Sequence, residues 1–276
     1  MESRVQVVTG GTSGMGLATA QAVAQYGPVI IGGRNEKRLA EAVQKLKDAG
    51  VDAYGARLDV ADLDSVKVFA DEACKIGPIG NVIHAAAVDM DNADTDTIVR
   101  INVIGTINVV ETFYPLLEEG GSLVNYTSVT GYYYRPSREE MGRWANPNDP
   151  DFFNVFKNGM EGFDAAAMGQ KAEATAYFGS KSFVMFYTRA NTARFGAKGC
   201  RVFSVAPGSF MTPMLEHQAA NFESIKQGTA FKRFGDPEEM AQLFAYLLDP
   251  KVAYLTGCDV LMDGGKFALT TTPQLA

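Results

Sequence analysis

A tyrosine and a lysine that could transfer a proton together lie four residues apart in the stretch AYFGSK, at Tyr177 and Lys181. The stretch begins a predicted helix over about residues 171–196, in which an i, i+4 spacing brings both side chains to one face. A lysine ammonium beside a phenol favours the tyrosinate and lowers the tyrosine pKa from about 10 towards neutrality, as a general acid or base requires. The pair therefore predicts a catalytic tyrosine.

Three consecutive tyrosines, Tyr132, Tyr133 and Tyr134, stand in the stretch GYYYRPSR. Tyr134 has Arg138 four residues later, but Pro136 lies between them and opposes a helix, so these two side chains share no face. The three tyrosines are predicted to shape what reaches the reaction, while Tyr177 carries its proton.

The elements that must position these side chains alternate as strand and helix along nearly the whole chain. Short apolar runs such as RVQVVTG, PVIIGG and CRVFSVAPG are separated by longer helical patterns, and helical crossovers connect parallel strands compactly. We expect an α/β fold with a doubly wound, seven-stranded parallel sheet of the Rossmann type, in a single domain over residues 1–276. Residues 132 to about 170 interrupt the alternation and are predicted to be an insertion in that domain.

The composition disfavours several classes of function. With 25 basic and 32 acidic side chains the net charge is −7, which argues against a nucleic-acid or anionic-membrane surface and favours a small-molecule ligand. The apolar runs are far shorter than the roughly 20 residues that span a bilayer, and no signal-peptide pattern is present, so we expect a cytoplasmic protein without membrane insertion. Three widely spaced cysteines and two histidines predict neither a disulfide framework nor a metal site.

A glycine-rich turn, TGGTSGMG, follows the first predicted strand and precedes a helix. Such a turn lets the backbone approach a pyrophosphate, and the N–H groups at the helix N-terminus favour its negative charge. The alternative is a tight strand-to-helix turn without a ligand. We favour a dinucleotide site, with predicted contacts at Gly10, Thr12, Ser13, Gly14, Met15 and Gly16.

An arginine stands where an NAD-binding chain would carry an acidic residue. Twenty residues past Gly14 the sequence reads IIGGRN, so that Arg34 occupies this place and Gly33 leaves room beside it. Because a guanidinium pairs with a 2′-phosphate, NADP(H) is favoured over NAD(H), which stays possible. In the alternative interpretation Arg34 is an exposed residue at a helix start, and Lys37 and Arg38 are ordinary surface charges.

Two further polar residues complete a recognisable set: Asn102 within RINVIGT, and Ser128 at the end of a strand in GGSLVNYTSVTG. With the glycine turn, Tyr177 and Lys181, they resemble the short-chain dehydrogenase/reductase family over nearly the whole chain. The stretches LDV, APGSFMT and TGCDVLMDGG fit the same pattern in the same order. The resemblance implies a homodimer or homotetramer.

The resemblance also implies a role for each residue. Tyr177 would exchange a proton with the substrate oxygen while hydride passes to or from a nicotinamide, and Ser128 would hydrogen-bond that oxygen. Lys181 would hold the nicotinamide ribose and lower the pKa of Tyr177, and Asn102 would hold a water in the proton path. Besides Tyr177 and Lys181, the implied cofactor contacts are Asp59, Val60, Ala85, Ala86, Pro207, Gly208, Phe210 and Thr212.

The chain departs from the family pattern in two places. Where the family usually has N-N-A-G after the fourth strand, this chain has HAAA, with small residues that keep the cofactor path open. We therefore expect His84 to be a hydrogen-bonded histidine of the sheet and not a catalyst. Ser128 and Tyr177 are 49 residues apart, much farther than the short loop of most family members.

The long segment between them bears on the substrate. Residues 132–176 hold eight aromatic side chains, including Trp144, the only tryptophan. A pocket wall for a large apolar substrate, an oligomer contact and a satellite core remain three open interpretations. A mobile lid is expected over about 210–232. The predicted substrate contacts are Tyr132, Tyr133, Met211, Met214 and Leu215.

These features predict an NADP(H)-dependent enzyme that interconverts a secondary alcohol and a ketone. The long segment and the stretch FSVAPGSFMTPML are similar to bacterial hydroxysteroid dehydrogenases and related carbonyl reductases, which implies a bile acid or other 3-hydroxysteroid. A 3-oxoacyl thioester or a xenobiotic ketone is the alternative substrate, and Arg135, Arg138 and Arg143 would suit phosphates on a thioester. An alternative from another class is a catalytically silent dinucleotide sensor.

Overall fold

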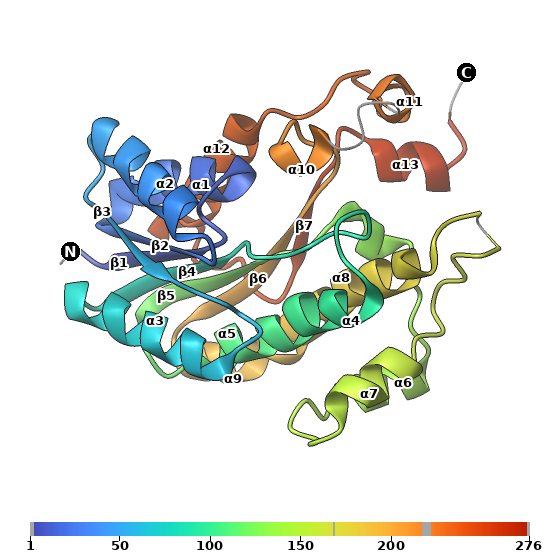
Figure 1. Ribbon diagram of the computed structural model, residues 1–276, viewed down its shortest axis with the longest axis horizontal. Coiled ribbons are helices and arrows are strands. Elements are labelled where there is room, and N and C mark those ends of the chain that lie inside the picture. The colour runs from blue at the N-terminus through green and yellow to red at the C-terminus, as the bar shows by residue number, and fades with distance from the viewer. Residues whose placement is uncertain (1–2, 168, 217–221, 275–276) are drawn as a thin grey trace.

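One parallel sheet organises the molecule. The computed structural model describes residues 3–167, 169–216 and 222–274. In this part of the chain seven strands, all parallel, run in the order β3-β2-β1-β4-β5-β6-β7 (Figure 1). They are β1 (Val5–Thr9), β2 (Val29–Gly33), β3 (Ala53–Arg57), β4 (Ile79–His84), β5 (Leu117–Tyr126), β6 (Arg201–Pro207) and β7 (Asp259–Met262). The predicted doubly wound, seven-stranded parallel sheet is confirmed.

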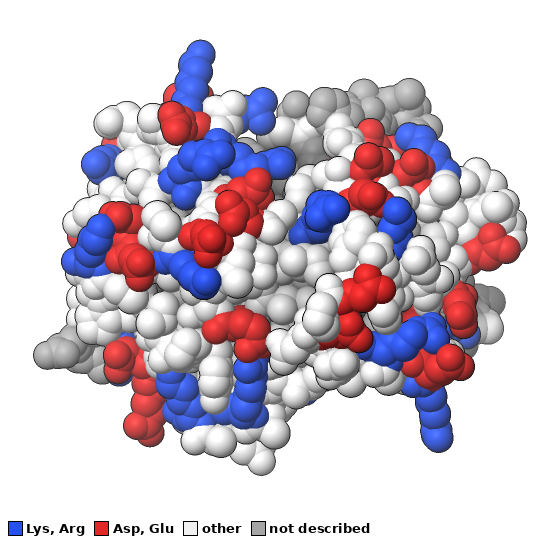
Figure 2. All heavy atoms as spheres, turned by 60° about the horizontal axis from the view of Figure 1, so that its bottom comes forward, with Lys and Arg blue, Asp and Glu red and all other residues white. Residues whose placement is uncertain are grey.

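Helices cover both faces of the sheet (Figure 1). On the face of the molecule that Figure 2 shows, acidic and basic side chains are interspersed. One face of the sheet packs against α1 (Gly14–Val23), α2 (Glu36–Asp48) and α12 (Pro237–Leu247). The other face packs against α3 (Leu63–Ile76), the continuous run of α4 (Thr95–Ile98), the π-helix η2 (Val99–Ile104) and α5 (Gly105–Phe113), and α8 (Ala172–Ala190) with α9 (Thr192–Ala197). Strands β1 and β4 are buried along their whole length because helices shield them on both sides.

Short helices and turns connect this framework. In the described part of the chain, 3₁₀ turns lie at η1 (Ala24–Tyr26), η3 (Val129–Tyr132) and η5 (Pro250–Val252). The short helices described there are α6 (Arg138–Trp144), α7 (Phe152–Asn158), α10 (Pro213–Glu216), α11 (Phe222–Gln227) and α13 (Lys266–Thr271). Among the described residues, no helix is both long and apolar enough to cross a membrane, and no group of three or more His, Cys, Asp or Glu is placed to hold a metal ion.

The 132–170 segment packs its aromatic side chains into the core. Trp144, at the end of α6, is 1% exposed. Its ring lies 6.0 Å from that of Tyr134, 5.6 Å from Phe156 on α7 and 5.7 Å from Phe183 on α8. These residues belong to the same apolar cluster as the sheet and α3. Of the three interpretations of this segment, the described side chains support the core.

The first two tyrosines of GYYY bind the C-terminal part of the chain. The Tyr132 hydroxyl donates to Asp259 Oδ2 on β7 at 2.6 Å, and the Tyr133 hydroxyl lies 2.7 Å from Thr270 Oγ1 on α13. Both rings pack on Phe267, with centroid distances of 5.1 and 5.3 Å. We call these contacts the C-terminal clasp.

Candidate active site

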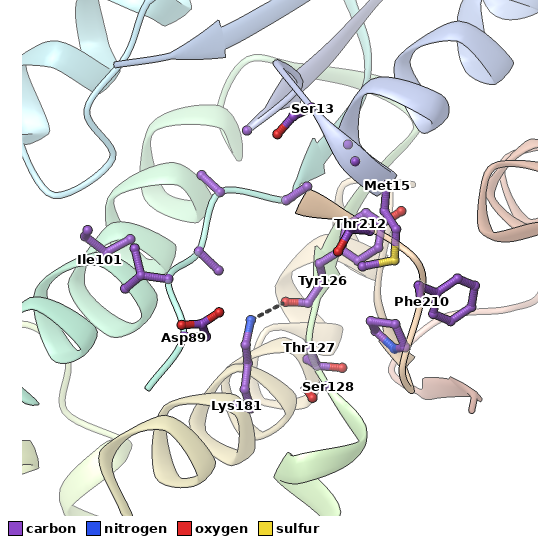
Figure 3. Close-up of a pocket in the computed structure, with 18 of the residues that line it drawn as sticks. Ser13, Met15, Asp89, Ile101, Tyr126, Thr127, Ser128, Lys181, Phe210 and Thr212 are labelled. Atoms are coloured by element: carbon purple, nitrogen blue, oxygen red, sulfur yellow. Dashed lines mark hydrogen bonds between the residues drawn. The ribbon is translucent and has the colours of Figure 1, made fainter. Parts of the chain in front are cut away.

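The cavity that holds the predicted site lies at the carboxyl ends of β1 and β4, where the order of the strands reverses. Such a switch point is where open α/β sheets bind ligands. The cavity has a volume of about 600 Å³, and its walls come from the glycine turn, the ends of β2 to β6 and the start of α8 (Figure 3). Tyr177, Lys181 and Ser128 therefore line the same space as the predicted dinucleotide turn.

The glycine turn is shaped for close approach of a ligand to the backbone. Gly10 has φ +68°, and a Cβ there would lie 2.7 Å from the backbone nitrogen of Ala86. A Cβ on Gly16 would lie 2.4 Å from the carbonyl oxygen of Gly10. The N-cap residue of α1, Ser13, makes no side-chain capping bond, and the first turn of α1 has no acidic residue. The N–H groups of this helix start are thus available to an anion, as a pyrophosphate requires.

Two arginines lie at the far end of the cavity from Tyr177. Arg34 follows β2 and Arg38 lies in the first turn of α2, and both line the cavity. Asn35 caps α2 by accepting a hydrogen bond from the backbone nitrogen of Arg38 at 2.9 Å. Neither guanidinium forms an ion pair or hydrogen bond with another side chain in the described part of the protein. Both charges are therefore open to a phosphate.

The predicted adenine and ribose contacts surround the same end of the cavity. Asp59 and Val60 follow β3 and line it, and Asp59 Oδ1 accepts a hydrogen bond from the Ala61 backbone nitrogen at 3.1 Å. Asn108 Nδ2 donates to the carbonyl oxygen of Val60 at 3.0 Å and fixes this turn. Ala85 and Ala86 line the floor beyond β4.

The three residues expected to act on the substrate come from two elements. Ser128 ends the segment after β5, and its Oγ caps η3 by accepting from the Thr130 backbone nitrogen at 3.2 Å. Tyr177 and Lys181 lie one turn apart on α8. Lys181 Nζ donates to the Tyr126 carbonyl oxygen at 3.4 Å (Figure 3). The same nitrogen lies 5.8 Å from the centre of the Tyr177 ring. Packing of α8 against η3 thus brings the tyrosine to the serine.

The expected fall in the pKa of Tyr177 is not found. Burial raises the pKa of the phenol to about 12, although the nearby side-chain hydroxyl groups of Ser128 and Thr130 oppose the rise, and the negative charge of Asp89 adds to it. Burial also lowers the pKa of the Lys181 ammonium to about 8. The prediction considered only the attraction between the two charges, whereas both groups lose their hydration in this cavity.

Asn102 holds a loop of the cavity wall through its side chain. It lies within η2, where its Oδ1 accepts from the Val88 backbone nitrogen and its Nδ2 donates to the Val88 carbonyl oxygen, both at 2.9 Å. Nδ2 also lies 3.2 Å from Ser180 Oγ on α8. The Asn102 side chain does not line the cavity, so its part in a proton path stays a prediction.

His84 is a hydrogen-bonded residue of the sheet, as expected. Its Nδ1 lies 2.8 Å from Thr9 Oγ1, and its Nε2 lies 3.1 Å from Thr106 Oγ1. Thr106 Oγ1 donates to the Asn102 carbonyl oxygen at 2.7 Å, so it must accept from Nε2–H, which leaves Nδ1 as the acceptor. Burial lowers the histidine pKa to about 3, so the ring is neutral. The chain of bonds links the end of β1 to the backbone of Asn102.

The loop after β6 closes the cavity from the other side. Pro207, Gly208, Phe210 and Thr212 line it as predicted, and Leu215 on α10 joins them. Met211 is 41% exposed and does not line the cavity. The Met214 side chain and residues 217–221 of the expected lid lie outside the described residues, so the lid stays a prediction.

The structure does not place Tyr132 and Tyr133 in the cavity wall. Their hydroxyl groups and rings are engaged in the C-terminal clasp. Within the 132–170 segment, Gln170 is the lining residue that the described part of the chain provides. The expectation that an aromatic wall from this segment contacts substrate therefore has no support from the cavity, because an aromatic-rich sequence does not reveal which surface its rings cover.

Three charged residues of the cavity were not found from the sequence as site residues. Arg38 is the third residue of α2, whereas Arg34 precedes the helix, so no helical spacing in the sequence relates the two. Asp89 follows β4 in the loop that Asn102 holds, and Lys266 begins α13 after β7. Burial lowers the pKa of Lys266, and nearby Asp263 opposes the fall. The sequence carries no spacing that links Asp89 or Lys266 to Tyr177.

The fold brings a tyrosine, a serine and a lysine to one cavity that continues to the glycine turn, an arrangement typical of oxidoreductases. A family model described as short chain dehydrogenase matches residues 4–139, and one described as enoyl-(acyl carrier protein) reductase matches residues 162–266. The chain belongs to the short-chain dehydrogenase/reductase family.

Individual relatives agree with this assignment. An uncharacterized oxidoreductase of Bacillus subtilis is 30% identical, with 98% of this chain and 93% of that protein covered. The 3-oxoacyl-(acyl-carrier-protein) reductase FabG of Thermotoga maritima is 28% identical, with 96% of this chain and 98% of that protein covered. A solved structure of an actinorhodin polyketide ketoreductase variant with NADPH has a TM-score of 0.76 at 24% identity, covering 96% of this chain and 98% of that chain, which shows a shared fold.

Proposed function

We propose that this protein uses NADP(H) to interconvert a ketone and a secondary alcohol. The observation that carries the proposal is the convergence of Tyr177, Ser128 and Lys181 on a cavity that continues to the glycine turn. The nicotinamide, when bound, supplies or accepts the hydride. The remaining chemistry falls to side chains of this protein.

Tyr177 acts as the proton donor in the reductive direction. With its pKa raised to about 12, the phenol is protonated throughout the physiological range, which is the form that donation needs. Ser128, whose hydroxyl group lies near the tyrosine in the same cavity, orients the carbonyl oxygen towards it. Lys181 lies behind the ring, where its charge stabilises the tyrosinate that remains after donation. This arrangement favours reduction at neutral pH.

Arg34 and Arg38 support NADP(H) as the cofactor. They are unpaired among the described side chains, and both line the end of the cavity that adjoins β2, where a 2′-phosphate would lie. Gly33 allows the end of β2 to approach Thr12 closely beside Arg34, since a Cβ on Gly33 would lie 2.6 Å from Thr12 Cγ2. NAD(H) would leave both guanidinium groups without a partner.

The hydroxysteroid stays a prediction that the cavity supports weakly. The prediction of a steroid substrate depended on an aromatic pocket wall from the 132–170 segment, but Trp144 and Tyr134 lie in the core. The cavity that Tyr177 lines presents the polar groups of Asp89, Thr130 and Lys266 together with apolar side chains such as Val88, Met90, Phe178 and Phe210. We therefore favour a ketone that carries a polar group besides the carbonyl.

A 3-oxoacyl thioester is a second candidate, which the similarity to a 3-oxoacyl-(acyl-carrier-protein) reductase favours. The three arginines of the 132–170 segment do not support a thioester substrate. Arg135, Arg138 and Arg143 do not line the cavity, and Arg143 pairs with Glu139 at 3.0 Å and with Glu161 at 3.5 Å. Lys266 would have to receive the anionic part of such a substrate.

Loss of NADPH absorbance with a panel of small ketones, 3-oxoacyl thioesters and 3-ketosteroids tests the proposal. Tyr177→Phe should abolish turnover but keep NADPH binding, because the ring remains and the proton is lost. Tyr246→Phe, at an exposed position on α12, is the matched control and should retain activity. Binding of NADPH without turnover of any carbonyl in the wild type would refute the proposal and favour the dinucleotide sensor. The cytoplasmic location and the homodimer or homotetramer stay predictions.

A further inference from the structure

Asp89 carries a buried carboxylate oxygen that the protein leaves without a partner. The residue is 6% exposed and lines the cavity on the loop after β4. Its Oδ1 accepts three hydrogen bonds, from the backbone nitrogens of Asp91 and Asn92 at 3.0 and 2.9 Å and from Asn92 Nδ2 at 2.8 Å. Its Oδ2 accepts none from the described part of the chain. One oxygen therefore fixes the loop, and the other is free for a ligand.

The loop holds this side chain in one orientation. Asn102 binds both backbone groups of the preceding residue, Val88, at 2.9 Å. Figure 3 shows the Asp89 side chain pointing from its loop toward the side of the cavity where Lys181 lies. Asp89 is also near enough to Tyr177 for its charge to act on the phenol. The carboxylate that carries the unpartnered oxygen thus lies in the cavity wall beside the reacting group.

A buried carboxylate oxygen without a hydrogen bond raises the free energy of the folded protein, and a ligand that donates to it recovers this loss. The ligand must be a donor, because an ionised carboxylate only accepts. We propose that Asp89 selects substrates that carry a hydrogen-bond donor, a hydroxyl or an ammonium group, a few atoms from the reacting carbonyl. This inference rests on the proposed function and specifies its substrate class.

The experiment compares cyclohexanone with its 2-, 3- and 4-hydroxy derivatives, the corresponding methoxy ethers and 4-aminocyclohexanone, with NADPH at saturation. We expect at least one hydroxy or amino ketone to exceed cyclohexanone in kcat/KM by about tenfold or more, the effect of one charge-assisted hydrogen bond. The methoxy ether at the same position should lose this gain, because it keeps the added oxygen but has no proton to donate. A gain confined to the amine identifies a cationic donor, and a gain for a hydroxyl identifies a neutral one.

Asp89→Asn is the matching variant. The amide keeps an oxygen for the loop but presents an NH₂ group in place of Oδ2, so the preference for the hydroxy or amino ketone should disappear while cyclohexanone is still reduced. Asp94→Asn is the control, because it removes one charge from an exposed helix cap on the same segment. The pH profile of alcohol oxidation should also move to lower pH in Asp89→Asn, since the charge that raises the pKa of Tyr177 is gone.

Two results would overturn the inference. The first is an equal kcat/KM for cyclohexanone and for all donor-bearing ketones in the wild type, which refutes the inference without a variant. A preference that survives in Asp89→Asn, with only the KM for NADPH raised, would assign Oδ2 to the cofactor instead. If no ketone is reduced at all, the proposed function fails before this one is tested, so the two failures are distinguishable.

Discussion

Replacing Trp144 with alanine distinguishes two roles for the aromatic side chains of the 132–170 segment, packing in the core and contact with the substrate. In the core, the indole contacts the rings of Tyr134, Phe156 and Phe183, and its removal leaves a cavity between α6, α7 and α8. Truncation of a buried tryptophan costs about 3–5 kcal/mol. An unfolding entropy of about 2.1 cal/mol/K per residue gives about 0.6 kcal/mol/K for the whole chain. Dividing the loss of unfolding free energy by this entropy predicts that Tm falls by roughly 5–9 °C.

The assay is thermal unfolding by circular dichroism, followed by kinetics at a temperature at which both proteins are folded. Because Trp144 does not line the cavity, kcat and KM for a small ketone should stay close to those of the wild type. Trp144→Phe, which keeps an aromatic ring at the same place, is the control and should lose less stability. A Tm unchanged within error, together with about a tenfold or larger fall in kcat/KM, would refute the core assignment and return the tryptophan to the substrate wall.

Three other predictions concern the cofactor and the proton. Arg34→Ala should reduce the preference for NADPH over NADH by about tenfold, the effect of losing one charge-assisted hydrogen bond to a phosphate. Lys37→Ala, outside the cavity, should leave the preference unchanged. The same ratio of NADPH to NADH efficiency in both variants would exclude a contact of Arg34 with the 2′-phosphate. Gly10→Ala should weaken NADPH binding and lower Tm more than Gly50→Ala. Both glycines have positive φ, but of the two only Gly10 has backbone atoms within 3 Å of a new Cβ. Equal effects would show that the cost comes from the backbone angle alone and not from a clash with the neighbouring backbone. Alcohol oxidation should rise with pH up to about pH 8, since the tyrosinate fraction grows below the raised pKa of Tyr177. Ketone reduction should fall above about pH 8, where Lys181 loses the charge that stabilises the tyrosinate. Oxidation that stays constant below pH 8, or reduction that stays constant above it, would contradict this assignment.

The sequence was sufficient to predict the features that depend on local spacing and on the order of elements along the chain. Alternating strands and helices imposed the parallel sheet, and the spacing of Tyr177 and Lys181 placed both on one face of α8, as found. The glycine turn was predictable because Gly10 must keep a positive φ beside Ala86.

What could not be predicted depends on contacts between distant segments. Nothing in the stretch GYYY indicates that Tyr132 finds Asp259, which lies 127 residues later. The free oxygen of Asp89 becomes visible only when the hydrogen bonds of the loop are known. The pKa of Tyr177 likewise depends on burial by the whole cavity, which outweighs the neighbouring lysine.

The C-terminal clasp has a practical consequence for handling the protein. Tyr133 binds Thr270 and both clasp rings pack on Phe267, so α13 is held by side chains that follow closely after Ser128. The same helix begins with Lys266, which lines the cavity. A truncation that removes α13 would therefore remove Lys266 from the cavity wall as well as the contacts of Tyr132 and Tyr133 with that helix. Kinetic values from a protein shortened within these residues would describe an altered cavity.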